Sequence, residues 1–218
     1  MRNAFKKRFY ASIILFIFMG IFMNNYGTVY QVEQTDLVLH WDKILISYNK
    51  YIDFPSQENA EELLASLPID APDKRIGDAE VVLKEIFSAE SYVILAQEAH
   101  SGDRIAVEIY FRMLNITDGL YAENIESGLG FIVRNHPRLF LEMLMKYKHN
   151  RRLRSGGYPV SFIGIGHNMH ARAAIHILQK RIDAIRSVKD LKYTDLKIDC
   201  IQQLRDAMKL RAQLVDKQ

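Results

Sequence analysis

The sequence predicts an all-α protein, either an antiparallel helical bundle or a short α-solenoid, that follows an amino-terminal signal peptide or membrane anchor. Three observations lead to this prediction. Apolar residues recur at helical spacing along most of the chain. Turn residues and prolines separate these segments at short intervals, as they do between antiparallel helices. Residues 1–27 have the composition of a targeting segment, so residues 28–218 are expected to form one separate domain.

The amino terminus has the layout of a secretory signal. A cluster of basic residues precedes an apolar run without charge at residues 9–23; the cluster consists of Arg2, Lys6, Lys7 and Arg8. A helix of this length spans about 22 Å, less than the roughly 30 Å of a bilayer core, which favours a cleaved signal. Asn25 and Gly27 are the best pair before a cleavage site, and Asn25 fits poorly there. An uncleaved anchor through residues 9–23 therefore stays open, as does a buried core helix.

The signal and the anchor have the same consequence for location. Basic residues ahead of an apolar segment stay on the cytoplasmic side of a membrane, so the chain from Gln31 onward is expected outside the cytoplasm. We expect an exported protein that is periplasmic or attached to the outer face of the inner membrane.

Charge and cysteine content exclude several classes of function. The chain has 29 basic and 26 acidic residues, and four of the basic ones lie among the first eight positions. The remainder is nearly neutral and lacks the basic footprint of a nucleic-acid-binding protein. Cys200 is the single cysteine, which excludes an internal disulfide and a multi-cysteine zinc site. We expect Cys200 to be a small core residue, and no metal or cofactor is predicted.

The first helix of the domain is predicted between Thr35 and Ile52. Its apolar stripe consists of Leu37, Trp41, Ile44, Tyr48 and Tyr51, with Val38, Leu45 and Ile52 beside it. Two heptads are too few for a coiled-coil seam, so this face is expected to pack in the core. A short helix capped by Ser56 follows, and the stretch from Pro68 to Gly77 is expected to be a connection and the domain's one hinge.

Regular punctuation follows from Gly77 onward. Helices are predicted at residues 78–87, 88–99, 104–114, 120–134 and 137–148, with Asp78 and Ser88 as caps and Pro137 as a first helical residue. Gly128 and Gly130 lie inside the fourth of these helices. We attribute them to the close approach of another helix rather than to a ligand.

One part of this succession has a family likeness. Asp118-Gly119 leads one helix, and Asn135-His136-Pro137 leads the next, which contains Leu139, Phe140, Leu141 and Leu144. From Ser88 to Tyr147 the chain resembles a HEAT-like α-helical repeat, without a sequence period over three copies. The resemblance implies a binding or scaffolding surface and no catalytic residues, and it transfers no specific site.

The last third of the chain contains the candidate chemistry. Residues 150–159 are expected to be a loop, residues 160–165 an extended piece or a helix start, and residues 168–187 and 194–215 two long helices. Gly164 and Gly166 precede a helix, but Met169 replaces the third glycine of a nucleotide-binding turn. His167 and His170 share a helix face, and His176 lies across it. No carboxylate partner or His-Glu-x-x-His motif accompanies them.

The basic cluster and the paired acids are weaker signals. The cluster consists of Lys146, Lys148, Arg151, Arg152 and Arg154, and could bind an anionic surface or an acidic partner. It could equally be a solvated loop that complements the end of the preceding helix. Paired carboxylates occur at Glu61 and Glu62, Glu123 and Glu126, and Glu98 and Asp103, and no pair stands out.

The sequence therefore favours a binding module over an enzyme. We expect an exported or membrane-tethered helical protein that binds another protein or an anionic surface, with no nucleic-acid partner. The alternative is an extracytoplasmic, hydrolase-like enzyme with a site near His167 and His170. A third possibility is a structural subunit of a membrane assembly. No catalytic or binding residue is assigned.

Overall fold

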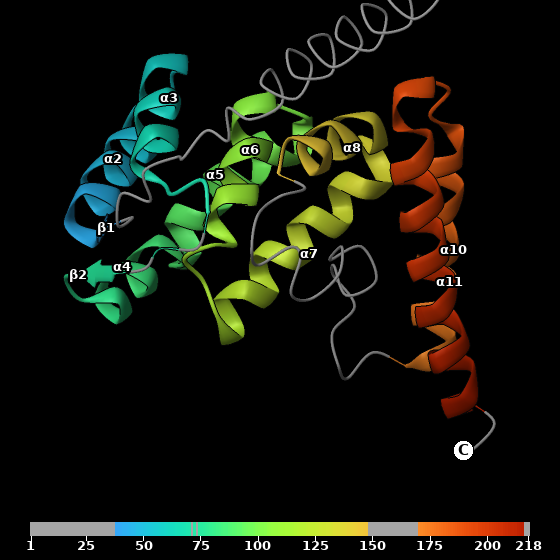
Figure 1. Cartoon of the computed structure of the whole chain (residues 1–218). Coiled ribbons are helices and arrows are strands. Elements are labelled where there is room, and N and C mark those ends of the chain that lie inside the picture. Colours follow the sequence, from blue (N-terminus) through green and yellow to red (C-terminus); the bar gives the residue numbers. More distant parts are fainter. Residues whose placement is uncertain (1–37, 71, 73, 148–169, 216–218) are drawn as a thin grey trace, which may run out of the picture. The chain divides into compact units, whose positions relative to one another are not determined.

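The computed structural model describes residues 38–70, 72, 74–147 and 170–215 (Figure 1). This part of the chain is mostly helical, which confirms the predicted class. Its α-helices are α2 (Trp41–Asp53), α3 (Gln57–Ser66), α4 (Ala79–Ile86), α5 (Ala89–Ser101), α6 (Arg104–Met113), α7 (Gly119–Asn135), α8 (Pro137–Lys146), α10 (Ala171–Ser187) and α11 (Thr194–Val215). Three short elements complete it: β1 (Val38–His40), β2 (Lys74–Ile76) and the 3-10 helix η1 (Leu191–Tyr193).

The predicted signal peptide or anchor at residues 1–27, with its apolar run at residues 9–23, lies outside the described residues. Among the helices that the structure does describe, none is both long enough and apolar enough to cross a membrane.

Two short strands correct the predicted start of the first helix. Val38 to His40 form β1, which pairs in parallel with β2 in the register Val38 to Lys74 and His40 to Ile76. The helix therefore begins at Trp41, and Val38 is 39% exposed instead of lying on its apolar face. Backbone pairing with a segment far along the chain outweighs the helical pattern here, and that partner lies inside the predicted connection.

The apolar stripe of α2 otherwise lies where its spacing predicts. Trp41, Ile44 and Tyr48 are fully buried, and Leu45 and Ile52 pack against the same core. The Tyr48 hydroxyl donates to the carbonyl oxygen of Ile86 at 3.0 Å, which ties α2 to the end of α4. The core interpretation of this helix is therefore confirmed.

Side-chain caps set the starts of α3, α4, α5 and α6. Ser56, Asp78, Ser88 and Asp103 each accept a hydrogen bond from a backbone N–H of the first turn, which satisfies donors that a helix leaves free. Gly102 ends α5 in the left-handed conformation, with φ +90°. The predicted boundaries are accurate to a few residues because these caps can be read from the sequence.

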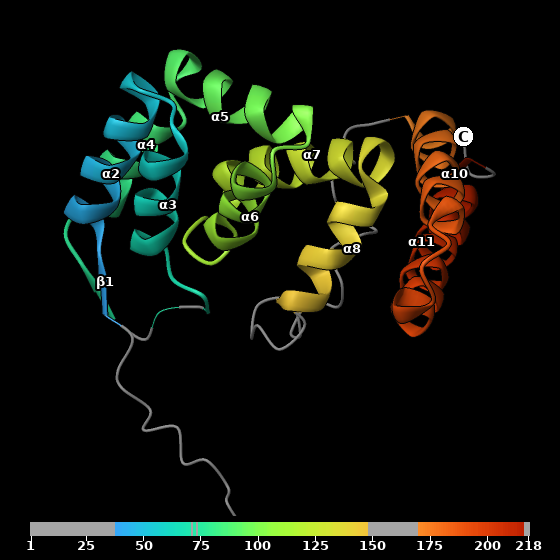
Figure 2. The ribbon, with the colours of Figure 1, turned by 90° about the horizontal axis from the view of Figure 1, so that it is seen from above.

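Each helix from α5 onward packs against its sequence neighbours. The two views agree that α10 and α11 lie side by side (Figures 1 and 2), and α10 also contacts α7 and α8. Cys200 of α11 is fully buried, as predicted. Gly128 of α7 faces Tyr110 of α6: a Cβ atom there would lie 2.2 Å from Tyr110 Cε1, which confirms a close helix approach.

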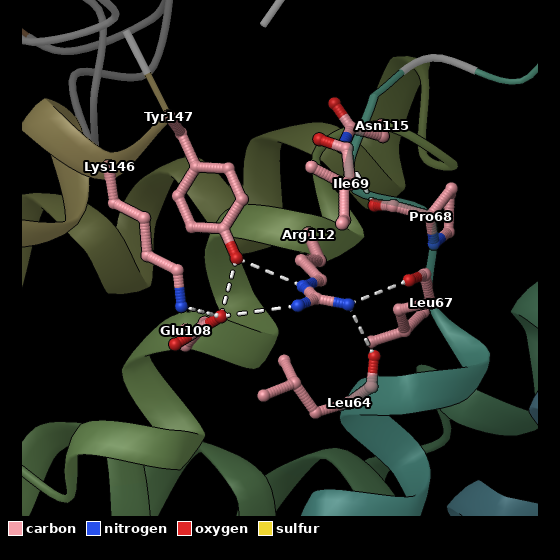
Figure 3. A network of polar contacts seen from close by, with 9 residues as sticks. All are labelled: Leu64, Leu67, Pro68, Ile69, Glu108, Arg112, Asn115, Lys146 and Tyr147. Atoms are coloured by element: carbon pink, nitrogen blue, oxygen red, sulfur yellow. Dashed lines mark hydrogen bonds and ion pairs between the residues drawn. The ribbon is translucent and has the colours of Figure 1, made fainter. Parts of the chain in front are cut away.

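A buried polar network joins α3, α6 and the end of α8 (Figure 3). Glu108 Oε1 accepts hydrogen bonds from the Tyr147 hydroxyl at 2.6 Å and from Lys146 Nζ at 2.5 Å, and Arg112 Nη2 lies 3.3 Å away. Burial by itself raises the pKa of Glu108, but the bonds from Lys146 and Tyr147 and the charge of Arg112 lower it more, so the carboxylate is ionised. The Glu108 carboxylate finds its hydrogen-bond and ion-pair partners within the protein, so we interpret this network as one that holds the helices together.

The same network holds the connection after α3. Arg112 Nη1 donates to the carbonyl oxygens of Leu64 and Leu67 at the end of α3, where the last carbonyl groups lack the usual helical partner. Asn115 Nδ2 donates to the carbonyl oxygens of Pro68 and Ile69 (Figure 3). Since this connection is bonded at its start and paired as β2 near its end, these contacts argue against the predicted hinge.

Candidate functional site

Of the two histidines in the predicted hydrolase-like site, His167 and His170, the structure describes only His170. His170 lies at the exposed start of α10, and its side chain makes no capping hydrogen bond. His167, Gly164 and Gly166 lie outside the described residues, so the hydrolase-like alternative stays a prediction. His176 is exposed on α10.

The other sequence candidates are dispersed. Lys146 is the one described member of the basic cluster, and its ammonium group is already bonded to Glu108. Glu61 and Glu62 are exposed, and Asp103 is the cap of α6. Within the described ranges, no three His, Cys, Asp or Glu side chains come close enough to hold a metal ion.

A cavity of about 330 Å³ lies where α5, α7 and α10 meet. Each helix contributes side chains at three- or four-residue steps, the spacing that places them on one face. The lining residues are Tyr92, Ala96 and His100 of α5, Asn124, Ser127, Gly128, Gly130, Phe131 and Arg134 of α7, and Ile177 and Arg181 of α10. We call this the arginine cavity. Its volume is at the lower end of the range for small-ligand pockets.

Arg181 is the unusual member of the arginine cavity. Its residue is only 3% exposed, and its Nε and Nη1 atoms are buried without a hydrogen-bond partner. Most buried polar groups in proteins are paired, and an unpaired charge is especially unfavourable. Its position follows from the helix: Leu178, Ile182 and Ile185 are buried on the same face of α10. An arginine thus stands at a position where an apolar residue would stabilise the fold more.

His100 presents a second unpaired group to the same cavity. Its Nε2 atom is buried without a partner, so three of the five such side-chain atoms in the described residues belong to His100 and Arg181. The imidazole is oriented by the Phe131 ring, 4.2 Å away between centroids. Arg134 Cζ lies 5.4 Å from the centroid of the same Phe131 ring, so both His100 and Arg134 pack against Phe131.

Tyr92, another residue of the lining, is held by two hydrogen bonds. The Tyr92 hydroxyl donates to the carbonyl oxygen of Asn124 at 2.9 Å and accepts from the Tyr110 hydroxyl at 2.9 Å. These bonds join α5, α6 and α7 behind the cavity. Gly128 leaves room for the Tyr110 ring at this point. The shape of the cavity is therefore set before any ligand enters.

The electrostatics of the arginine cavity are positive. Burial, followed by the charge of Arg134, lowers the pKa of Arg181 to about 10, so its guanidinium is still charged at neutral pH. Burial, followed by His136, lowers the pKa of His100, which keeps its imidazole neutral there. None of the described residues that line the cavity is acidic. The arrangement offers positive charge and N–H donors, which suit a bound anion.

No protein-family model, curated protein or solved structure matches this chain. The HEAT-like resemblance stays a prediction.

A second, wider hollow of about 810 Å³ is a weaker candidate. Its charged residues are of both signs, and three of them, Arg138, Glu142 and Asp190, form ion pairs. Arg138 Nη2 lies 3.8 Å from Asp190 Oδ2, and Glu142 Oε1 lies 2.5 Å from Arg104 Nη1. Among the described residues that line this hollow, none has a buried polar side-chain atom without a partner, in contrast to the arginine cavity.

Arg181 and His100 were missed at the sequence level, although a signal for Arg181 exists. In the predicted helix at residues 168–187, the buried face repeats at Ala174, Leu178 and Ile185, and Arg181 interrupts it. A charged residue inside an apolar stripe could have been singled out. For His100 no comparable signal exists, since its role depends on Phe131 from another helix.

Proposed function

We propose that this protein is a binding module that holds an anionic group of its partner in the arginine cavity. The observation that carries the proposal is the buried guanidinium of Arg181, whose Nε and Nη1 atoms have no hydrogen-bond partner. A charge kept in such a place destabilises the free protein, and an anion with oxygen acceptors would supply both the missing charge and the missing hydrogen bonds. The predicted partner, another protein or an anionic surface, is retained here as a proposal.

We also infer that the helices from α5 onward form a short α-solenoid of HEAT-like kind. Support comes from the order of contacts: α5 contacts α6 and α7, α6 contacts α7 and α8, and α7 contacts α8 and α10. Packing against the next helix and the next but one is typical of stacked helical repeats, which present extended binding surfaces. The arginine cavity would then be a specific point on such a surface.

The proposed place of action is outside the cytoplasm, either in the periplasm or on the outer face of the inner membrane. The basic cluster before residues 9–23 supports this proposal. The mass of the protein recovered from fractionated cells tests it. A loss of about 2.5–3 kDa would indicate a cleaved signal, full mass in the membrane fraction would indicate an anchor, and full mass in the cytoplasm would contradict export.

Anion-dependent stabilisation tests the binding function. The full-length chain in a non-ionic detergent is unfolded by heat with sulfate, phosphate, acetate or glutamate at matched ionic strength, and the fluorescence of the one, fully buried tryptophan, Trp41, is followed. A ligand at 100 times its Kd adds about 2.7 kcal/mol, which corresponds to roughly 5–10 °C in Tm.

The controls separate binding from general salt effects, because sulfate and phosphate stabilise most proteins. Arg181→Met removes the guanidinium from the cavity, and Arg172→Met makes the same change at an exposed position of α10. We expect at least one anion to stabilise the wild type and the Arg172 variant more than the Arg181 variant. Equal responses of all three to every anion would overturn the proposed function.

A further inference from the structure

The charges around the arginine cavity indicate how many negative charges its ligand carries. Arg134 and Arg181 both line it, and the charge of Arg134 acts on Arg181 directly enough to lower the pKa of that group. In the part of the lining that the structure describes, no residue is acidic. A singly charged anion would balance one guanidinium and leave the repulsion of the other, whereas a doubly charged group balances both.

The sequence just before α10 cannot supply the missing negative charge. Residues 148–169 contain no aspartate or glutamate, and they add four basic residues, Lys148, Arg151, Arg152 and Arg154. The counter-charge for Arg134 and Arg181 therefore has to come from elsewhere, and a ligand is the direct source.

The neutral part of the lining indicates what accompanies the charge. Phe131, Ala96 and Ile177 offer an apolar wall, and Asn124 and Ser127 offer polar side chains beside it. His100 adds a neutral imidazole with an unpaired Nε2. Such a lining suits a compact, strongly charged head attached to a small organic portion, within about 330 Å³.

We propose that the anionic group held in the arginine cavity is the doubly charged phosphate of a phosphate monoester. This inference rests on the proposed anion-binding function and specifies its ligand class. Phosphate concentrates two charges and several acceptor oxygens on one atom, which matches two guanidinium groups converging on a small space. Two sources share this chemistry: a soluble phosphate monoester and the head group of phosphatidic acid.

Calorimetric titration of the full-length protein at pH 8 tests the ligand class. A phosphate monoester is fully doubly charged there, because its second pKa is about 6. The probes are glycerol 3-phosphate, dimethyl phosphate as a singly charged diester, and succinate as a doubly charged dicarboxylate. Dihexanoyl phosphatidic acid represents the lipid source. Below its micelle concentration it forms no membrane, so insertion of residues 9–23 into a bilayer does not contribute to the measured heat.

We expect a monoester to bind at least about tenfold more tightly than dimethyl phosphate and succinate. Arg181→Met should weaken that binding at least about tenfold, and Arg134→Met, at an exposed position that leaves the core intact, should weaken it several-fold. Arg172→Met should leave it unchanged. Preference for glycerol 3-phosphate would identify a soluble ligand, and preference for dihexanoyl phosphatidic acid a lipid head group.

Two outcomes would overturn the inference in distinguishable ways. If dimethyl phosphate or succinate binds as tightly as the monoesters, and Arg181→Met abolishes that binding, the ligand class is wrong while the anion-binding function stands. If none of the four probes binds, or if binding is unchanged by Arg181→Met and Arg134→Met, the phosphate monoester is excluded as the ligand of the arginine cavity. Failure of every anion in the thermal experiment as well would remove the proposed function itself.

Discussion

The ring of Tyr110 fills the space that a Cβ atom at Gly128 would need, with Cε1 only 2.2 Å from that point. Tyr110 is fully buried and hydrogen-bonded to Tyr92, so its ring cannot swing aside. We therefore predict that Gly128→Ala lowers the free energy of unfolding by about 1–3 kcal/mol, the usual effect of overpacking. Chemical denaturation followed through Trp41 measures this change.

The direction of the Gly128 effect is diagnostic. At an ordinary helix position, alanine in place of glycine stabilises by about 1 kcal/mol. Glu123→Ala, at an exposed position of the same helix, serves as the control and should change stability by less than about 0.5 kcal/mol. A more stable Gly128→Ala variant would show that α6 and α7 do not approach as closely as described.

Glu108→Gln should destabilise the protein at neutral pH by about 2–4 kcal/mol. The substitution removes the negative charge that Arg112 and Lys146 share, and it leaves a largely buried guanidinium without its charged partner. Because the folded pKa of Glu108 is lowered, its contribution is complete above the ordinary value of 4.5 and is lost as pH falls through the lower folded value. The wild type and the variant should therefore converge in stability in acid.

Denaturation curves at pH 7 and at pH 3 test the role of Glu108. Glu142→Gln is the matched control, because Glu142 pairs with Arg104 at the surface and such pairs contribute at most about 1 kcal/mol. A stability difference for Glu108→Gln that stays the same at both pH values would contradict an ionised, network-bound carboxylate.

Arg181→Met should make the free protein more stable. It replaces a buried, unpaired charge with an apolar side chain of similar length on the apolar face of α10, so we expect a gain of about 1–3 kcal/mol. Thermal unfolding without added anions measures the gain, and Arg172→Met should show almost none. A loss of stability in the Arg181 variant would mean that the guanidinium supports the fold, which would weaken the argument for a binding role.

Cys200 should be unreactive in the folded protein. It is fully buried, and burial, followed by the charge of Asp199, raises the pKa of its thiol to about 12. The reactive thiolate is therefore scarce at pH 8. A thiol-specific chromogenic reagent should give no signal with the native chain and one thiol per chain in denaturant. Rapid reaction of the native protein would place Cys200 outside the core.

The helices could be predicted because their signals are local. Ser56, Asp78, Ser88 and Asp103 stand at the caps, and the helices that they begin follow within a residue or two. The strand pair could not be predicted in this way. Val38 and Ile76 are extended because β1 pairs with β2, and α2 and α3 lie between these two strands in the sequence. A segment of three residues is too short for its periodicity to indicate a distant partner.

The arginine cavity depends even more on packing between helices. Arg181, Arg134 and His100 lie on three different helices, and each has an ordinary interpretation alone: a surface arginine, a cation near a helix end and a polar histidine. The sequence pattern indicated His167 and His170 instead, which lie three residues apart in the chain. Spacing reveals groups on one helix, whereas convergence of groups from α5, α7 and α10 appears only in three dimensions.

The parallel pairing of β1 with β2 has a mechanical consequence. Hydrogen bonds in a parallel pair are spaced evenly along the strands, so a pull on Val38 along β1 is resisted by all of them together. If residues 9–23 are retained as an anchor, tension from the membrane enters the domain at this strand, directly ahead of Trp41. The hydrogen bonds between β1 and β2 would then have to break before the tension could separate α2 from the core.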